Sequence, residues 1–258
     1  MAPAPHGMTP EQLATYQAEG VVRLPGAVPA ADVDALAEVV WRRLRTGHGI
    51  VRNKPETWIV PHPAQLSAKT DELAGMASPT VRAVLDQLLA PDGWTPPERW
   101  GLPLVTLPGF AERRDAPYKG WHLDIPATPE PPRVARIFLL LADLAAGGGG
   151  TGYVAGSHRV LRALARDLGR PLKSGEARGL LVAREPWFAG LFARPGGEDR
   201  CARFMDQPGE AGGVPVQVGE MTGRAGDAYV MDPLVLHAVM PNAGRQPRLM
   251  LTQWVYGR

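Results

Sequence analysis

The sequence contains almost no cysteine and no long apolar run. Cys201 is the only cysteine in 258 residues, so neither an intrachain disulfide nor a cluster of thiolate metal ligands can form. The longest apolar stretch, residues 137–142, is far too short to cross a lipid bilayer. Residues 1–7 contain no apolar segment of the kind that a signal peptide requires. We therefore expect a cytoplasmic protein.

The chain also lacks a marked excess of charge of either sign. Its 28 lysine and arginine residues stand against 26 aspartate and glutamate residues, and only four of the cations are lysines. Domains that bind nucleic acid or membrane surfaces concentrate basic residues, so this near balance indicates neither partner. The expected partner is a small-molecule substrate, and the sequence contains no signal of oligomeric state.

Glycine and proline are abundant, with 30 and 27 residues, while apolar content is an ordinary 45 %. This composition favours a loop-rich β fold over a helical bundle. We expect one domain over residues 1–258, in which residues 1–100 form a helical N-terminal support and residues 101–258 a β core. Apolar spacing and the cap at Thr9-Pro10 predict helices that begin at Thr9, over 29–44 and over 80–90, with a strand at 21–24.

Short apolar runs separated by glycine and proline turns follow residue 101 and predict a sandwich or barrel. The predicted strands are 102–107, 121–125, 134–141, 151–154, 214–218, 228–231, 234–239 and 249–256. Residues 160–213 interrupt this pattern, and an insertion of that length is typical of a functional lid or a mobile segment. Its arginines, Arg194, Arg200 and Arg203, either meet an acidic group of the substrate or form a solvated basic loop.

One short stretch suggests a metal site. His122 and Asp124 are two residues apart, and on a β-strand such residues share a face. His237, inside the apolar run 234–239, could supply a third ligand. Two histidines and one carboxylate form the facial triad that holds non-haem Fe(II) and leaves coordination positions open. The alternatives are a hydrogen-bonded polar pair on a half-buried strand and a core histidine with internal partners.

An arginine stands eleven residues beyond His237. Arg248 opens the last predicted strand, and a planar guanidinium there could bind a carboxylate in a bidentate manner. A surface salt bridge at the strand entrance is the alternative for this residue. Arg245, three residues earlier in a loop, is a competing candidate that we consider weaker.

Taken together, these motifs resemble the phytanoyl-CoA dioxygenase family from about residue 9 to residue 254. The residues that carry the resemblance are Thr9-Pro10-Glu11-Gln12, Glu19-Gly20-Val21-Val22, Pro25-Gly26, His122-x-Asp124, Gly149-x-Thr151, Ala155-Gly156-Ser157-His158-Arg159, Gly226-Asp227, His237, Pro241-Asn242 and Arg248. The resemblance implies a double-stranded β-helix (jelly roll, cupin-like) core with flanking helices.

The resemblance also implies cofactors and roles for the site residues. His122, Asp124 and His237 would hold Fe(II), and Arg248 would bind the far carboxylate of 2-oxoglutarate, with help from the hydroxyl of Thr151. Such an enzyme uses O2, releases succinate and CO2, and hydroxylates or otherwise oxidises a substrate C–H bond. Related halogenases lack the carboxylate that Asp124 supplies, so its presence favours hydroxylation. A metabolite or natural-product intermediate is the expected substrate.

Two positions depart from the family pattern. Val239 stands where the family often has a serine that contacts the co-substrate, and Ala155 replaces a common proline. The first change leaves Arg248 with fewer neighbours for 2-oxoglutarate.

Other motifs favour structural roles. The glycines at 147–150 lack the Gly-Lys-Ser/Thr ending of a phosphate loop and predict a turn. His158 follows a Gly-Ser turn and is interpreted as structural, whereas His6, His48 and His62 show no ligand spacing. Residues 51–58 could cover the substrate or only connect two helices.

Two rival functions remain open on the sequence alone. A divalent-metal hydrolase or isomerase of cupin-like fold could use the same His/Asp/His site without needing Arg248. A non-catalytic binding module of the same fold is the second rival.

Overall fold

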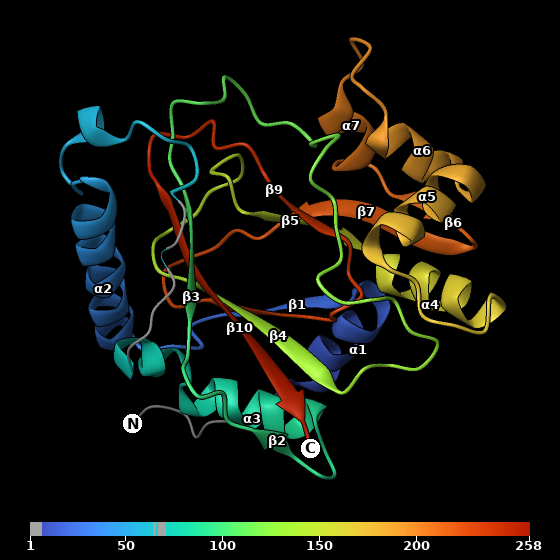
Figure 1. Ribbon diagram of the computed structural model, residues 1–258, viewed down its shortest axis with the longest axis horizontal. Coiled ribbons are helices and arrows are strands. Elements are labelled where there is room, and N and C mark those ends of the chain that lie inside the picture. Colours follow the sequence, from blue (N-terminus) through green and yellow to red (C-terminus); the bar gives the residue numbers. More distant parts are fainter. Residues whose placement is uncertain (1–6, 64–65, 67–70) are drawn as a thin grey trace.

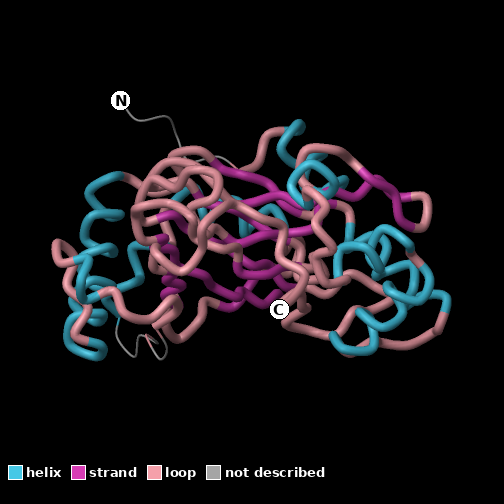
Figure 2. The backbone as a smooth tube through the Cα atoms, turned by 90° about the horizontal axis from the view of Figure 1, so that it is seen from above, coloured by secondary structure: helices cyan, strands magenta, loops and turns pink. Residues whose placement is uncertain are grey.

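Two antiparallel β-sheets form the centre of the computed structural model, which describes residues 7–63, 66 and 71–258 (Figures 1 and 2). His6 lies outside the described residues. The larger sheet has the order β1 (Val21–Leu24), β8 (Ala228–Met231), β4 (Val134–Leu140), β10 (Arg248–Gly257) and β2 (Trp94–Thr95), and β3 (Leu102–Thr106) also pairs with β10. The smaller sheet has the order β6 (Gly209–Ala211), β7 (Val214–Glu220), β5 (Thr151–Ala155) and β9 (His237–Val239). This arrangement confirms the predicted jelly-roll class.

Strand β4 explains how the larger sheet separates the helices from the interior. All seven of its residues are buried, because each of its faces is covered. Ile137 and Leu139 belong to the apolar cluster shared with the N-terminal helices, whereas Phe138 and Leu140 join an inner cluster between the sheets. Arg136 lies two residues before Phe138 on this strand, so its side chain points to the same face, toward the interior.

The N-terminal helices cover the outer face of the larger sheet (Figure 1). They are α1 (Pro10–Glu19), α2 (Ala30–His48) and α3 (Pro79–Leu88), with short 3-10 helices at Pro55–Thr57 and Asp71–Met76. A capping box between Thr9 and Gln12 starts α1, and Gly20, at φ 79°, ends it. Within 51–58, Trp58 donates to the carbonyl of Val51 and packs against this cluster, which favours the connector interpretation.

Residues 160–213 form an ordered helical layer on the opposite side of the molecule (Figure 1). The helices are α4 (Ser157–Asp167), α5 (Ser174–Arg184), α6 (Pro186–Phe192) and α7 (Arg200–Phe204), and they share one apolar cluster with the smaller sheet. Both interpretations of Arg200 are wrong, because its side chain is only 1 % exposed and donates to carbonyls of the protein. Arg203 pairs with Glu198 at 2.5 Å.

Residues 121–125 do not form the predicted strand. Gly120 adopts φ 82°, which turns the chain just before them, and Pro126 follows without an N–H group. Only His122 makes a β-bridge, with His237. The predicted strand 234–239 is likewise reduced to β9, whereas β1 and β8 have the predicted bounds. Among the described helices, none combines the length and apolar character that crossing a membrane requires.

Candidate metal centre

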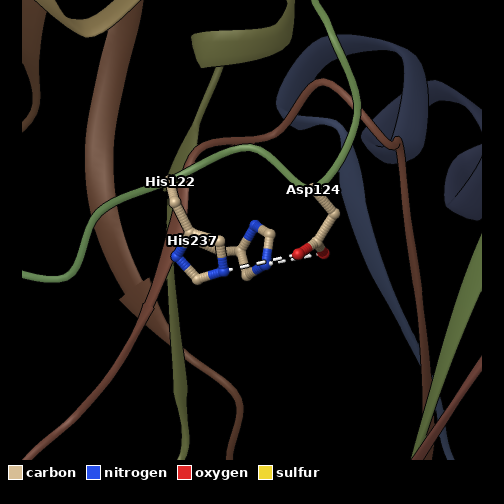
Figure 3. Close-up of side chains that lie close together, drawn as sticks. All are labelled: His122, Asp124 and His237. Carbon is tan, nitrogen blue, oxygen red and sulfur yellow. Dashed lines mark ion pairs between the residues drawn. The ribbon is translucent and has the colours of Figure 1, made fainter. Parts of the chain in front are cut away.

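Three side chains from two distant parts of the chain converge at one point, and each offers one ligand atom (Figure 3). The ligand atoms of His122, Asp124 and His237 all lie within 4.8 Å of one another. The carboxylate of Asp124 is central, with one oxygen 3.4 Å from Nε2 of His122 and the other 3.2 Å from Nε2 of His237. Two imidazole nitrogens and one carboxylate oxygen are a donor set that suits non-haem Fe(II).

His122 and Asp124 lie on an irregular loop that neighbouring elements hold in place. The backbone N–H of His122 donates to the carbonyl of His237 at 3.0 Å, and the reciprocal bond is 3.2 Å long. The N–H of Leu123, between the two candidate ligands, donates to the hydroxyl of Ser174 at 2.9 Å. Further along, Ala127 and Leu172 exchange two backbone hydrogen bonds. The helical layer therefore fixes the loop that carries two candidate ligands.

His237 is the buried member of the group, with a side chain only 4 % exposed. Its Nδ1 lies 3.0 Å from the carbonyl of Val235, and Nδ1 of His122 lies 2.7 Å from the carbonyl of Gly120. Since a carbonyl can only accept, each ring donates from an Nδ1–H group, and Nε2 is the nitrogen that it presents to Asp124 and to a metal ion. Burial, then the neighbouring Arg136 and His122, lower the pKa of His237 to about 3. A neutral imidazole is the form that binds metal.

Arg136 is a site residue that the sequence analysis missed. Its guanidinium pairs with the carboxylate of Asp124, and its Nη1 lies 2.8 Å from Nε2 of His237. Burial lowers the pKa of Arg136 to about 10, so the group is still a cation at neutral pH. The available signal was a charged residue at an inward-facing position of the otherwise apolar run 134–141.

The structure brings Arg248 and Thr151 together, whereas Arg245 is exposed to solvent. Arg248 is fully enclosed and donates from Nη1 to the hydroxyl of Thr151 at 3.2 Å. Burial lowers its pKa to about 10, and Glu220 opposes that shift. Among the described residues, neither Nε of Arg248 nor the hydroxyl of its strand partner Thr106 has a hydrogen-bond partner. Such unpaired buried groups are typical of a polar ligand site.

A cavity of about 360 Å³ lies at this end of the site. Thr106 and Val239 line it, and Val239 is 46 % exposed. His62 also lines the cavity, and its pKa is lowered by burial and then by the charge of Arg248. The sequence analysis had assigned no role to His62 or Thr106.

Three other motifs have structural roles. The N–H groups of Gly147 and Gly150 donate to the carboxylate of Glu220 at 2.9 and 3.1 Å, so the four-glycine segment binds a side chain of the protein itself. His158 is buried, with Nε2 3.2 Å from the carbonyl of Gln17. The side-chain amide of Asn242 donates to the carbonyls of Thr106 and Gln246, which fixes the turn before β10.

The fold is shared with several solved structures at low sequence identity. The epimerase SnoN, a non-haem alpha-ketoglutarate-dependent protein from nogalamycin biosynthesis, is 19 % identical with a TM-score of 0.53, over 96 % of this chain and 81 % of SnoN. The carbocyclase SnoK from nogalamycin biosynthesis is 17 % identical with a TM-score of 0.56, over 97 % of this chain and 84 % of SnoK. EctD from S. alaskensis, solved with 2-oxoglutarate and 5-hydroxyectoine, is 17 % identical with a TM-score of 0.57, over 100 % of this chain and 78 % of EctD.

The sequence was also compared with family models and curated proteins. No curated protein matches the chain. The family model of phytanoyl-CoA dioxygenase (PhyH) matches residues 16–250, which is most of the sequence. The chain therefore belongs to the phytanoyl-CoA dioxygenase family of Fe(II)- and 2-oxoglutarate-dependent oxygenases.

Proposed function

We propose that this enzyme oxidises an unactivated C–H bond of a small-molecule metabolite or natural-product intermediate. The observation that carries the proposal is the convergence of His122, Asp124 and His237 beside a buried Arg248 with an unpaired Nε. In this proposal the first three residues hold Fe(II), and Arg248 and Thr151 bind the far carboxylate of 2-oxoglutarate. Iron bound with 2-oxoglutarate and O2 supplies the oxidation, with release of succinate and CO2.

The protein contributes orientation and a dry environment. Arg248 has no acidic partner among the ion pairs of the described residues, so a dicarboxylate would supply the missing anion. The hydroxyl of Thr106 could donate to the same carboxylate, because Thr106 faces Arg248 across the β3–β10 pair. This hydroxyl would offset the absence of a serine at position 239.

Hydroxylation is the reaction that we infer. Asp124 keeps the third ligand position occupied by the protein, so no halide replaces it. SnoN and SnoK are an epimerase and a carbocyclase, so oxidation of a C–H bond on this fold also leads to other products. Both come from nogalamycin biosynthesis, which supports a natural-product substrate for this chain.

We also infer one catalytic domain over residues 1–258, with residues 1–100 as support and residues 160–213 as an insertion beside the site. Ser174 and Leu172 contact the loop that carries His122 and Asp124, and these contacts support this division. The cytoplasmic location expected from the sequence stays a prediction.

Anaerobic addition of Fe(II) and 2-oxoglutarate to the purified protein tests the proposal. The expected result is a weak visible charge-transfer band with one 2-oxoglutarate per chain. Arg248→Gln should weaken 2-oxoglutarate binding by about 100-fold or more, because the distal carboxylate loses a bidentate charged partner. The exposed Arg245→Gln is the matched control and should bind normally.

The divalent-metal hydrolase or isomerase predicts the opposite outcome. It has no dicarboxylate pocket, so it would bind metal without forming the band and would tolerate Arg248→Gln. That result would overturn the oxygenase proposal.

A further inference from the structure

Arg136 reaches the candidate metal centre from the middle of the larger sheet and is held firmly there. The residue is 8 % exposed, and its Nε donates to the hydroxyl of Thr252 at 3.2 Å. Its guanidinium carbon lies 4.7 Å from the ring centroid of Phe138 and 4.8 Å from that of Trp254. Cation–π contacts and one hydrogen bond therefore fix the head group inside the barrel.

The remaining contacts of this guanidinium are with two of the three candidate ligands. It pairs with Asp124, and Nη1 donates to Nε2 of His237 at 2.8 Å. Among the described residues, Asp124 is the only acid paired with Arg136. Glu220, a buried acid that also acts on the charge of Arg248, already accepts from two glycine N–H groups and lies 3.5 Å from Arg114.

A metal ion would compete with Arg136 for both of these partners. Asp124 and His237 would direct their lone pairs to the metal, so the guanidinium would lose an acceptor and part of its counter-charge. A buried cation beside a divalent cation is strongly unfavourable unless an anion lies between or beside them. Even if one oxygen of Asp124 still pairs with Arg136, the loaded site favours a further anion next to this guanidinium.

Arg136 and Arg248 lie at different ends of the buried interior between the two sheets. Arg136 pairs with Trp254, six residues along β10 from Arg248, which separates the two backbones by about 20 Å. Arg248 points to Thr151 and Arg136 to the metal ligands. The two guanidiniums thus bracket the site, with Arg136 at its metal end.

We propose that Arg136 binds a carboxylate held beside the metal, on the side of Asp124 and His237. This inference rests on the proposed function. Two carboxylates have the required chemistry: the one next to the keto group of 2-oxoglutarate, and one carried by the organic substrate. Either would replace the counter-charge that Asp124 gives to the metal.

Anaerobic Fe(II) titrations distinguish the two sources. Wild type, Arg136→Gln, Arg136→Lys and Arg248→Gln are titrated with 2-oxoglutarate and with 2-oxobutyrate, which keeps the chelating end but lacks the far carboxylate. If Arg136 binds the keto-acid carboxylate, Arg136→Gln weakens both ligands by about 10- to 100-fold. Arg136→Lys recovers part of that loss, and Arg248→Gln weakens only 2-oxoglutarate.

If the carboxylate belongs to the substrate, Arg136→Gln binds both keto acids normally. Acetate added to the Fe(II)–2-oxoglutarate complex then shifts the charge-transfer band of wild type and not that of the variant. The inference is overturned if Arg136→Gln binds both keto acids normally and responds to acetate as wild type does. It is also overturned if the keto-acid affinities are unchanged and wild type itself shows no response to acetate.

Two controls separate these outcomes from other failures. Arg133→Gln removes an exposed arginine three residues away and should match wild type in every titration. Thermal unfolding and Co(II) stoichiometry establish that each Arg136 variant folds and binds metal, and Arg136→Lys serves if the glutamine variant does not fold. Absence of the band in wild type would instead reject the proposed function, and this inference with it.

Discussion

The two halves of the candidate metal centre are built in different ways. His237, Arg136 and Arg248 project from strands, and their side chains are buried between two sheets. His122 and Asp124 project from an irregular loop, and their side chains are 45 % and 28 % exposed. The strand half depends on sheet pairing, whereas the loop half depends on hydrogen bonds from the helical layer of residues 160–213.

This difference shows how one site can be both rigid and open. Buried strands keep charged groups in fixed positions in a dry interior, where their electrostatic interactions are strong. An exposed loop gives metal and small molecules access from solvent. The helical layer therefore supports the exposed half in addition to any covering role.

Removing one ligand from each half should give the largest effect and test the comparison directly. His122→Ala and His237→Ala should each weaken Co(II) binding by more than about 100-fold, since each removes one of three protein ligands. In the metal-free protein, only His237→Ala should lower the free energy of unfolding, by about 1–3 kcal/mol, because it breaks buried contacts. Metal titration and urea unfolding measure the two effects. Equal destabilisation by both variants would contradict the division into two halves.

Breaking the attachment of the helical layer should have the next largest effect. Arg200 donates to the carbonyls of Ala116 and Leu191 at 2.9 and 2.6 Å, which joins the layer to the segment before the metal loop. Arg200→Met should lower the free energy of unfolding by about 2–3 kcal/mol, because buried carbonyls lose a charged donor. The control Arg203→Met removes a side chain that is 48 % exposed and should cost less than about 0.5 kcal/mol.

Low pH should lower the free energy of unfolding of the metal-free protein through His237, which belongs to the strand half of the site. The folded pKa of about 3 lies below the ordinary unfolded value of about 6.5, so between these values only the unfolded chain binds the proton. Stability is therefore lost as pH falls below about 6.5, and the loss at pH 5 should be about 2 kcal/mol. Urea unfolding from pH 7 to pH 5 should show a smaller decline for His237→Gln than for wild type. Parallel declines would exclude His237 as the source.

The smallest effect should come from one hydroxyl in the loop half. Ser174→Ala removes the acceptor of the Leu123 N–H, which should lower the free energy of unfolding by about 1 kcal/mol and the metal affinity by up to about 10-fold. Ser174→Thr keeps a hydroxyl and should restore most of both. If only stability falls, other contacts hold the ligands in place.

Apart from Arg136, the residues of the strand half were easier to predict from the sequence than the conformation of the loop half. Apolar runs bounded by turns located β1 and β8 at their observed limits. Arg248 was preferred to Arg245 because it matches the co-substrate arginine of the family that the sequence resembles, and because the strand that follows would direct it inward. The irregular backbone conformation of the loop half could not be predicted from the sequence. His122 and Asp124 have the alternation of a strand, but a positive φ at Gly120 and the distant hydroxyl of Ser174 override that local preference.

Arg136 and Arg200 escaped prediction for a common reason. The role of a charged residue inside an apolar strand or a polar loop depends on which distant residues it contacts in the fold. Arg136 meets His237 across 101 residues, and Arg200 meets Ala116 across 84. Local patterns identify the element but not such a partner.

Strand β10 places Arg248, Met250, Thr252 and Trp254 on one face, and it pairs with β4 on one side and with β3 on the other. Because side chains alternate, deleting a single residue near its start would bring Leu249 to the position of Arg248 and turn the whole row outward. The register of β10, and not only the identity of Arg248, is therefore a requirement of the site that this strand carries.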